Sequence, residues 1–229
     1  MLINDVDEKN GCTEIDDTEF YKNRTSKAFF NIVCITSMLG LSIVSMYMFY
    51  QNTLSKEGYA TLTKILLVAL FISAHYFLPY PLSCYGLNRN NMRQVLKESI
   101  GISVFFLLMS IGFRHYLISV GFEEMQFRFN FKLDILFYPV FAFLQEIVTK
   151  GFVQSYLYST LDKHKHKRLF AILGSSMIFG LTHLIHGYAV MGGIFAFSVF
   201  TGWYYEKDRN IWGVTIIHTI LGWSLFYFQ

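Results

Sequence analysis

Charged residues are what this sequence has least of. Only 15% of its 229 residues are Asp, Glu, Lys or Arg, whereas a soluble globular domain carries about 25%. Hydrophobic residues make up 53%, and the mean hydropathy is +0.37. So few charges cannot cover a water-facing surface, which excludes a soluble enzyme, and the same apolar composition excludes intrinsic disorder. The net charge of +3 gives no indication of a nucleic-acid partner, and none is expected.

Cysteine and proline are also scarce, with three residues of each. The cysteines, Cys12, Cys34 and Cys84, are widely spaced and odd in number, which is typical of neither a disulfide framework nor a metal-binding motif. Two prolines near residue 80 end one apolar stretch. The third, Pro139, lies inside another stretch, where we expect it to kink a helix.

Long apolar stretches are what the sequence has instead. They cover residues 28–50, 59–78, 95–113, 133–160, 168–187, 189–205 and 210–228. Most are long enough to cross a hydrocarbon core of ~30 Å as a helix. Each is continuous rather than alternating, which favours helices over the strands of a barrel. We predict an all-α fold, a polytopic membrane helix bundle of about seven transmembrane helices, spanning residues 27–229 after a polar tail at residues 1–26.

The distribution of basic residues predicts the orientation of this bundle. With the N-terminus in the cytoplasm, thirteen Lys and Arg residues flank the cytoplasmic ends of the seven segments and five flank the outer ends. Cytoplasmic loops carry the excess of basic residues, so we expect a cytoplasmic N-terminus and contacts with membrane lipid. The location expected is an integral membrane protein, in a bacterial plasma membrane given the scattered cysteines, although an endoplasmic-reticulum membrane also fits.

Only one acidic residue lies deep in an apolar stretch. This residue is Glu146, and a charge at membrane depth costs ~2.5–3.5 kcal/mol on insertion scales. Lys150 follows four residues later, on the same face of a helix, so the spacing predicts an ion pair between the two side chains. Such a pair is either purely structural or part of a functional site.

Two histidines fall inside other apolar stretches, His183 in the fifth and His218 in the seventh. A single buried histidine is usually a hydrogen-bonded core residue, but two histidines and one glutamate on three helices suggest a common polar pocket. We expect Glu146, Lys150, His183 and His218 to converge there. The carboxylate and imidazoles could activate a water and stabilise an oxyanion without a cofactor. The alternative is a zinc site formed by Glu146, His183 and His218, although the sequence lacks an HExxH motif.

Three short motifs in this region resemble those of a known family. They are Gln145-Glu146-Ile-Val-Thr-Lys150-Gly151, similar to Glu-Glu-x-x-x-Arg-Gly; Phe179-Gly-Leu-Thr-His183, similar to Phe-x-x-x-His; and His218-Thr-Ile-Leu-Gly222, at the place of His-x-x-x-Asn. Their order and spacing resemble the CPBP family, the CAAX prenyl proteases and bacteriocin-processing (Abi) proteins. The resemblance covers residues 133–228 and implies an all-helical intramembrane endopeptidase.

This sequence departs from the family pattern at three positions. The first glutamate, which the resemblance implies as general base beside His183, is Gln145, and an amide cannot accept a proton. The arginine is Lys150, which lacks the guanidinium fork. The final asparagine, which would polarise the scissile carbonyl together with His218, is Gly222. Replacing Gln145 by Glu and Gly222 by Asn is therefore predicted to restore both functions.

Three functions fit these observations. The first is an intramembrane endopeptidase in which Glu146 and His183 activate water and His218 stabilises the oxyanion. Its substrate would be a membrane-delivered peptide, such as a prenylated C-terminus or a secreted-peptide precursor. The second is an inactive pseudoprotease that binds a peptide or membrane protein, as a bacteriocin immunity protein or scaffold, which Gln145 and Gly222 favour. The third is a small transporter that uses the polar residues as a relay, which no inverted repeat supports.

Overall fold

All regular structure in the described residues is helical. The computed structural model describes residues 17–77, 82–89, 91–120, 134–161 and 164–226. The helices are α2 (Asp17–Tyr50), α3 (Lys56–Phe77), α4 (Met92–Ser119), α5 (Asp134–Glu146), α6 (Ser155–Thr160), α7 (Lys167–Leu181), α8 (Tyr188–Asp208) and α9 (Ile211–Phe226). Short 3₁₀ turns lie at η1 (Leu82–Tyr85) and η3 (Leu184–His186), and a π-helix forms η2 (Ile147–Gln154). The prediction of an all-α fold is confirmed.

The described part of each predicted apolar stretch lies largely on one of these helices or on a run of them. Four helical segments are long and apolar enough to cross a membrane. They are Ala28–Tyr50, Lys56–Ala74, Met92–Gly112 and Ile135–Thr160, and a shorter apolar helix covers Ile211–Ser224. The count of seven spans and the cytoplasmic N-terminus stay predictions. Residues 17–26 of the predicted polar tail belong to helix α2, and the first sixteen residues lie outside the described part of the chain.

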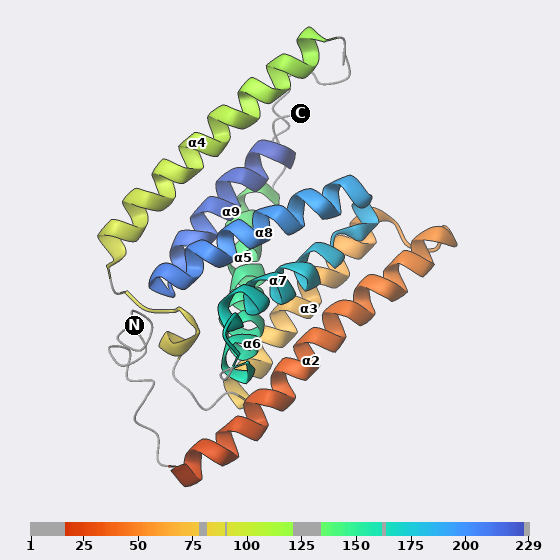
Figure 1. Cartoon of the computed structure of the whole chain (residues 1–229). Helices are drawn as coiled ribbons and strands as arrows, with labels where there is room; N and C mark the ends of the chain where they lie inside the picture. Colours follow the sequence, from red (N-terminus) through yellow and green to blue (C-terminus); the bar gives the residue numbers. More distant parts are fainter. Residues whose placement is uncertain (1–16, 78–81, 90, 121–133, 162–163, 227–229) are drawn as a thin grey trace.

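The helices divide into an outer and an inner set. In Figure 1, α2 and α4 lie at opposite edges of the molecule, and α5 runs through its middle. Only 17–22% of the residues are buried in the three apolar windows of α2, α3 and α4, compared with 56% in the window Ile135–Thr160. The outer helices therefore expose apolar side chains such as Ile43, Ile65 and Leu108, as expected where lipid is the solvent.

The central helix changes its geometry at the first motif. Helix α5 continues through Pro139 to Glu146, and the backbone then widens into the buried π-helix η2. Gly151 allows this segment to pack against η1, because a Cβ at this position would lie 2.7 Å from the Tyr85 carbonyl oxygen. π-Helical turns are rare and occur frequently at functional sites.

Buried polar side chains join η2 to helix α8. The Lys150 ammonium donates to the backbone oxygen and the hydroxyl of Ser198, at 2.7 and 2.6 Å. One turn further along, the Gln154 amide donates to the Gly202 carbonyl and to Glu206. These bonds satisfy polar groups that would be costly to leave unpaired in a membrane, and they fix the two helices in register.

The cysteines behave differently from one another. Cys34 is a free, fully buried thiol in the core of α2. Cys84, in η1, is disulfide-bonded. The spacing of the cysteines gave no indication that any of them is bonded, and the structure shows that one of them is.

Candidate active site

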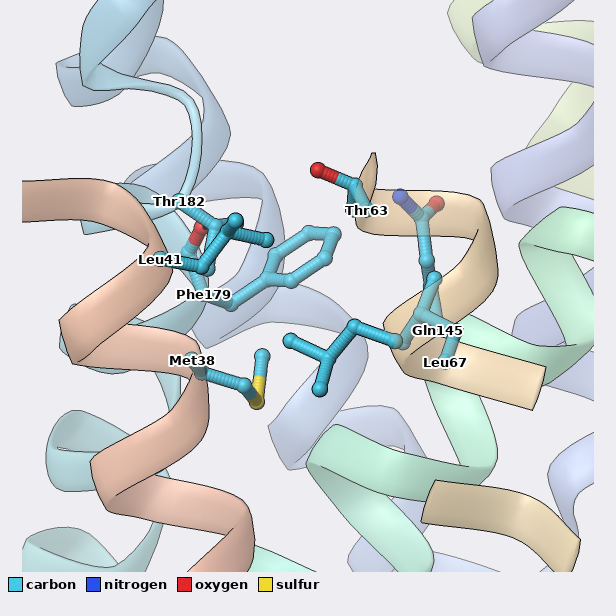
Figure 2. Close-up of a pocket in the computed structure, with 8 residues that line it drawn as sticks. Met38, Leu41, Thr63, Leu67, Gln145, Phe179 and Thr182 are labelled. Atoms are coloured by element: carbon cyan, nitrogen blue, oxygen red, sulfur yellow. Dashed lines mark hydrogen bonds between the residues drawn. The ribbon is translucent and has the colours of Figure 1, made fainter. Parts of the chain in front are cut away.

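A cavity of about 230 Å³ lies among α3, α5 and the end of α7. Its described lining residues are Tyr59, Ala60, Thr63, Lys64, Leu67, Tyr138, Phe141, Gln145, Thr182, His183 and His186. A smaller pocket beside it shares part of this lining and adds residues of α2 (Figure 2). The described lining includes one lysine and two histidines but no carboxylate, so the cavity is suited to neutral or anionic polar groups.

Gln145 brings the first motif into this cavity. Figure 2 shows its amide near Thr63 of α3, and both residues line both pockets. The Gln145 side chain makes no hydrogen bond to another described residue, whereas the Thr63 hydroxyl donates to the Tyr59 carbonyl at 3.0 Å. The amide can therefore donate to or accept from a ligand, but it cannot take up a proton.

His183 brings the second motif to the same cavity. Its Nδ1 lies 3.0 Å from the Phe179 carbonyl oxygen and 3.1 Å from the Thr182 hydroxyl. A carbonyl oxygen can only accept, so Nδ1 carries the hydrogen in that bond, and Nε2 of the neutral ring keeps its lone pair. The Tyr59 hydroxyl donates to the Thr182 carbonyl and so ties α3 to this turn. The imidazole is therefore held in an orientation that suits a base.

Glu146 and His218 form a buried pair. Both residues are buried, and Glu146 Oε1 lies 2.7 Å from His218 Nδ1. The carboxylate accepts from Nδ1–H, an arrangement that fixes the tautomer and the orientation of an imidazole. Neither residue is among the described residues that line the cavity. Glu146 Oε2 has no hydrogen-bond partner in the described part of the chain.

The expected pair between Glu146 and Lys150 is wrong. Within the residues described, the ion-pair partner of Glu146 is His218, and Lys150 bonds to Ser198. The physical reason is the π-helix, in which the backbone hydrogen bonds run from i to i+5, so that a residue four positions later no longer lies above the first. Lys150 thus acts as a buried clamp between two helices.

The structure places the motif residues in two neighbouring groups. Gln145 and His183 line the cavity, and Glu146 and His218 form the buried pair. The Phe179 ring contacts both histidines, with centroids 4.8 Å from His183 and 5.9 Å from His218. The described residues include no group of three His, Cys, Asp or Glu side chains placed to hold a metal ion, so Glu146, His183 and His218 do not form the alternative zinc site in this arrangement.

Comparison with protein families identifies the class of protein to which this arrangement belongs. The family model of the type II CAAX prenyl endopeptidase Rce1-like proteins matches residues 108–224. The chain belongs to this family. The match includes all three motifs and begins before the region in which the sequence motifs lie. No curated protein and no solved structure matches the chain.

The side chain of Tyr138 fills the space beside Gly222, the position at which the family motif is expected to have an asparagine. This glycine stands where the Rce1-like motif is expected to carry an asparagine, one turn after His218 on α9. A Cβ at position 222 would overlap the hydroxyl and the ring of Tyr138, with the Tyr138 Cε1 atom at 2.5 Å. The space for an asparagine side chain is therefore filled. The expectation that Gly222→Asn alone restores a donor needs correction, because the new side chain would collide with Tyr138.

Sequence reasoning missed two further residues of the site, Tyr138 and Lys64. Lys64 lies inside the apolar span of α3, with its ammonium 4.9 Å from the centroid of the Phe141 ring. It has no carboxylate within ion-pairing distance among the described residues. The signal that could have found it was available, since a lysine within a span marks a functional site by default.

Proposed function

We propose that this chain is an intramembrane endopeptidase that hydrolyses a membrane-delivered peptide, such as a prenylated C-terminus, with His183 as general base. The observation that carries the proposal is His183 itself. It lines the cavity and uses Nδ1 to hold its orientation, which leaves Nε2 to accept a proton. The protein acts in the membrane, with the bacterial plasma membrane as the proposed location, and requires no cofactor.

The reaction follows from that orientation. His183 Nε2 accepts a proton from a water in the cavity as the water oxygen adds to the scissile carbonyl carbon. The tetrahedral intermediate collapses when the C–N bond breaks and the proton passes from His183 to the leaving nitrogen. The products are a new carboxyl terminus and a free amine. The Gln145 amide, which has no other described partner, orients the water or the peptide by hydrogen bonding.

Glu146 and His218 have a supporting role in this proposal. Their side chains bond to each other, and they lie outside the described cavity lining. A buried carboxylate that holds an imidazole fixes the rings packed around it, here Tyr138, Phe179 and Phe197. We infer that Glu146 positions His218 instead of taking the proton of the attacking water.

Lys64 supports a substrate with a negative charge near the scissile bond. Its ammonium faces a cavity whose described lining contains no acidic side chain. An anionic group entering the cavity would find no repulsion there and one unpaired cation. The terminal carboxylate of a short C-terminal peptide meets this requirement, which fits removal of a few residues from the end of a lipidated protein.

A cleavage assay on the purified protein in detergent tests the proposal. The probes are a fluorogenic farnesylated peptide with a free C-terminus and the same peptide without the lipid. We expect the parent protein to cleave the farnesylated probe and His183→Ala to lose about 10²–10⁴-fold in rate, the usual contribution of a general base. His164→Ala, at an exposed position outside the described cavity lining, is the matched control. Cleavage that survives His183→Ala would contradict the assignment.

The second candidate is a pseudoprotease that binds a peptide without cutting it, as an immunity protein or scaffold. Gln145 favours it, because the carboxylate expected of the family is missing from the cavity. This function predicts saturable binding of the farnesylated probe with no product. The same assay, read by fluorescence anisotropy as well as by cleavage, separates the two functions.

A further inference from the structure

Tyr138 is among the residues that line the cavity, and its phenolic hydroxyl is a hydrogen-bond donor. It lies two turns before Gln145 on α5, so the two side chains share one face of the helix, and both line the cavity with His183. A phenol donates a hydrogen bond through its O–H and stays protonated at neutral pH. Tyr138 therefore adds a donor to a cavity whose other polar groups include a base.

The position of the phenol is set by Gly222. Any side chain at position 222 would overlap the Tyr138 hydroxyl and ring. The hydroxyl thus occupies the place that the first atoms of a residue-222 side chain would otherwise take. The ring also contacts His218 edge-on, with centroids 6.1 Å apart and an interplanar angle of 72°. Glycine at 222 and tyrosine at 138 are complementary in shape, because the tyrosine ring fits in this position only when residue 222 has no side chain.

We propose that Tyr138 donates its phenolic O–H to the oxygen of the scissile carbonyl as that oxygen becomes negatively charged. The role deepens the proposed function and rests on it. When water adds to the carbonyl carbon, the carbonyl π electrons move to the oxygen, and the Tyr138 hydrogen bond stabilises the resulting oxyanion without transferring its proton. When the C–N bond breaks, the oxygen returns to a carbonyl and the bond weakens. A donor aimed at a developing oxyanion is a large source of rate acceleration.

The first test removes only the hydroxyl. Tyr138→Phe keeps the ring, so we expect kcat for the farnesylated probe to fall by about 10²–10³-fold, the usual effect of losing one oxyanion donor. The KM value and the unfolding temperature in detergent should stay close to those of the parent. Tyr47→Phe, which removes a hydroxyl from an exposed residue of α2, is the matched control. A loss confined to KM or to stability would overturn the role.

The second test moves the donor to the other helix. Gly222→Asn alone should lose activity and stability, because the new side chain collides with Tyr138. Tyr138→Ala combined with Gly222→Asn makes room for the amide, and we expect at least about a tenfold higher kcat than for Tyr138→Ala alone, since an amide N–H can replace the phenol as donor. Tyr138→Ala with Gly222→Ala fills part of the space without a donor and should show no gain. Equal rates for these two double variants would contradict the proposal.

The outcomes also separate this role from the proposed function. If His183→Ala is inactive while Tyr138→Phe keeps the parent kcat, the role of Tyr138 is wrong and the endopeptidase function stands. If the parent cleaves neither the farnesylated nor the unmodified probe, both are wrong. If Tyr138→Phe loses kcat and the relocated asparagine restores part of it, both are supported.

Discussion

Gln145 and Glu146 are neighbours in the chain but lie in opposite surroundings. Gln145 faces the cavity, and its amide makes no hydrogen bond to a described residue. Glu146 is 1% exposed and bonds to the imidazole of His218. The two positions of one sequence motif therefore differ in environment, one at the cavity and one in the core. The position that lines the cavity carries an amide, and the position that carries a carboxylate is buried outside the described cavity lining.

This contrast shows that retention of an acid in a motif does not identify the base. Adjacent helical residues point about 100° apart, so one of a pair can face a cavity while the other faces the core. A base must reach the water that it activates. In the proposed mechanism the group that meets that requirement is His183, which lines the cavity, and the Glu146 carboxylate holds His218 outside the described lining.

The largest effect expected is a loss of stability at the closed position. Glu146→Leu leaves the buried His218 ring without its partner, and breaking a buried pair typically costs ~3–5 kcal/mol. Combining it with His218→Phe removes both polar groups and should recover most of that loss. Glu146→Leu with Lys150→Met should recover much less, because no direct ion pair joins these two residues and the Lys150 ammonium bonds to Ser198. Chemical unfolding in detergent measures the free energies of unfolding of the parent and of these three variants. Recovery by Lys150→Met instead of by His218→Phe would contradict the pairing.

A gain of activity is expected at the open position. Gln145→Glu places a proton acceptor in the cavity beside His183, and we expect the cleavage rate to rise by up to about 10²-fold, the low end of general-base effects because His183 already acts as a base. The rate constant for the farnesylated probe measures this change. Glu146→Asp keeps a carboxylate in the closed pair and serves as the comparison that should bring no gain. A rate that falls on Gln145→Glu would mean that the amide itself is required.

The π-helix that follows Glu146 should be sensitive to one methyl group. Gly151→Ala brings a Cβ to 2.7 Å from the Tyr85 carbonyl oxygen, and such overpacking costs about 1–3 kcal/mol. Gly192→Ala, on α8 with no atom within 4 Å of the added Cβ, is the matched control. The control should be neutral or slightly stabilising, as is usual for Gly→Ala in a helix. Equal unfolding temperatures for the two variants would show that η1 does not restrain the π-helix.

The smallest effect concerns Lys64 and the charge of the substrate. Lys64→Met should raise KM about fivefold for a probe with a free C-terminal carboxylate, since a partly exposed ion pair contributes ~1 kcal/mol. The same probe with an amidated C-terminus should show no change. Lys56→Met, at an exposed position of the same helix, is the control. An equal rise in KM for both probes would point to a packing effect and not to charge recognition.

The sequence predicted much of the fold because lipid allows few solutions. Continuous apolar stretches are most readily helices in a membrane, so the described parts of the expected segments lie largely on helices. The motif residues were also found, since a charge or imidazole in an apolar span stands out. The way they pair could not be predicted, because Ile147–Gln154 form a π-helix and an i, i+4 argument assumes an α-helix.

Tyr138 was beyond sequence reasoning for a different reason. A tyrosine in an aromatic-rich apolar stretch looks like an ordinary core residue. Its significance depends on a contact with Gly222, eighty-four positions later in the chain, which only the three-dimensional arrangement reveals. From the sequence alone, Gly222 indicates that an asparagine donor is missing. In the structure, the glycine leaves space that the Tyr138 hydroxyl occupies.

The most direct test of the central claim is a single-turnover digestion in water enriched in heavy oxygen. The parent protein, in excess over the farnesylated peptide, is incubated in this water, and the peptide products are weighed by mass spectrometry. Hydrolysis by the parent, with Gln145 in place, predicts a shortened peptide that carries one heavy oxygen in its new carboxyl group. A peptide that binds to the parent but stays intact, and is cut only after Gln145→Glu, would contradict the claim that His183 is a sufficient base.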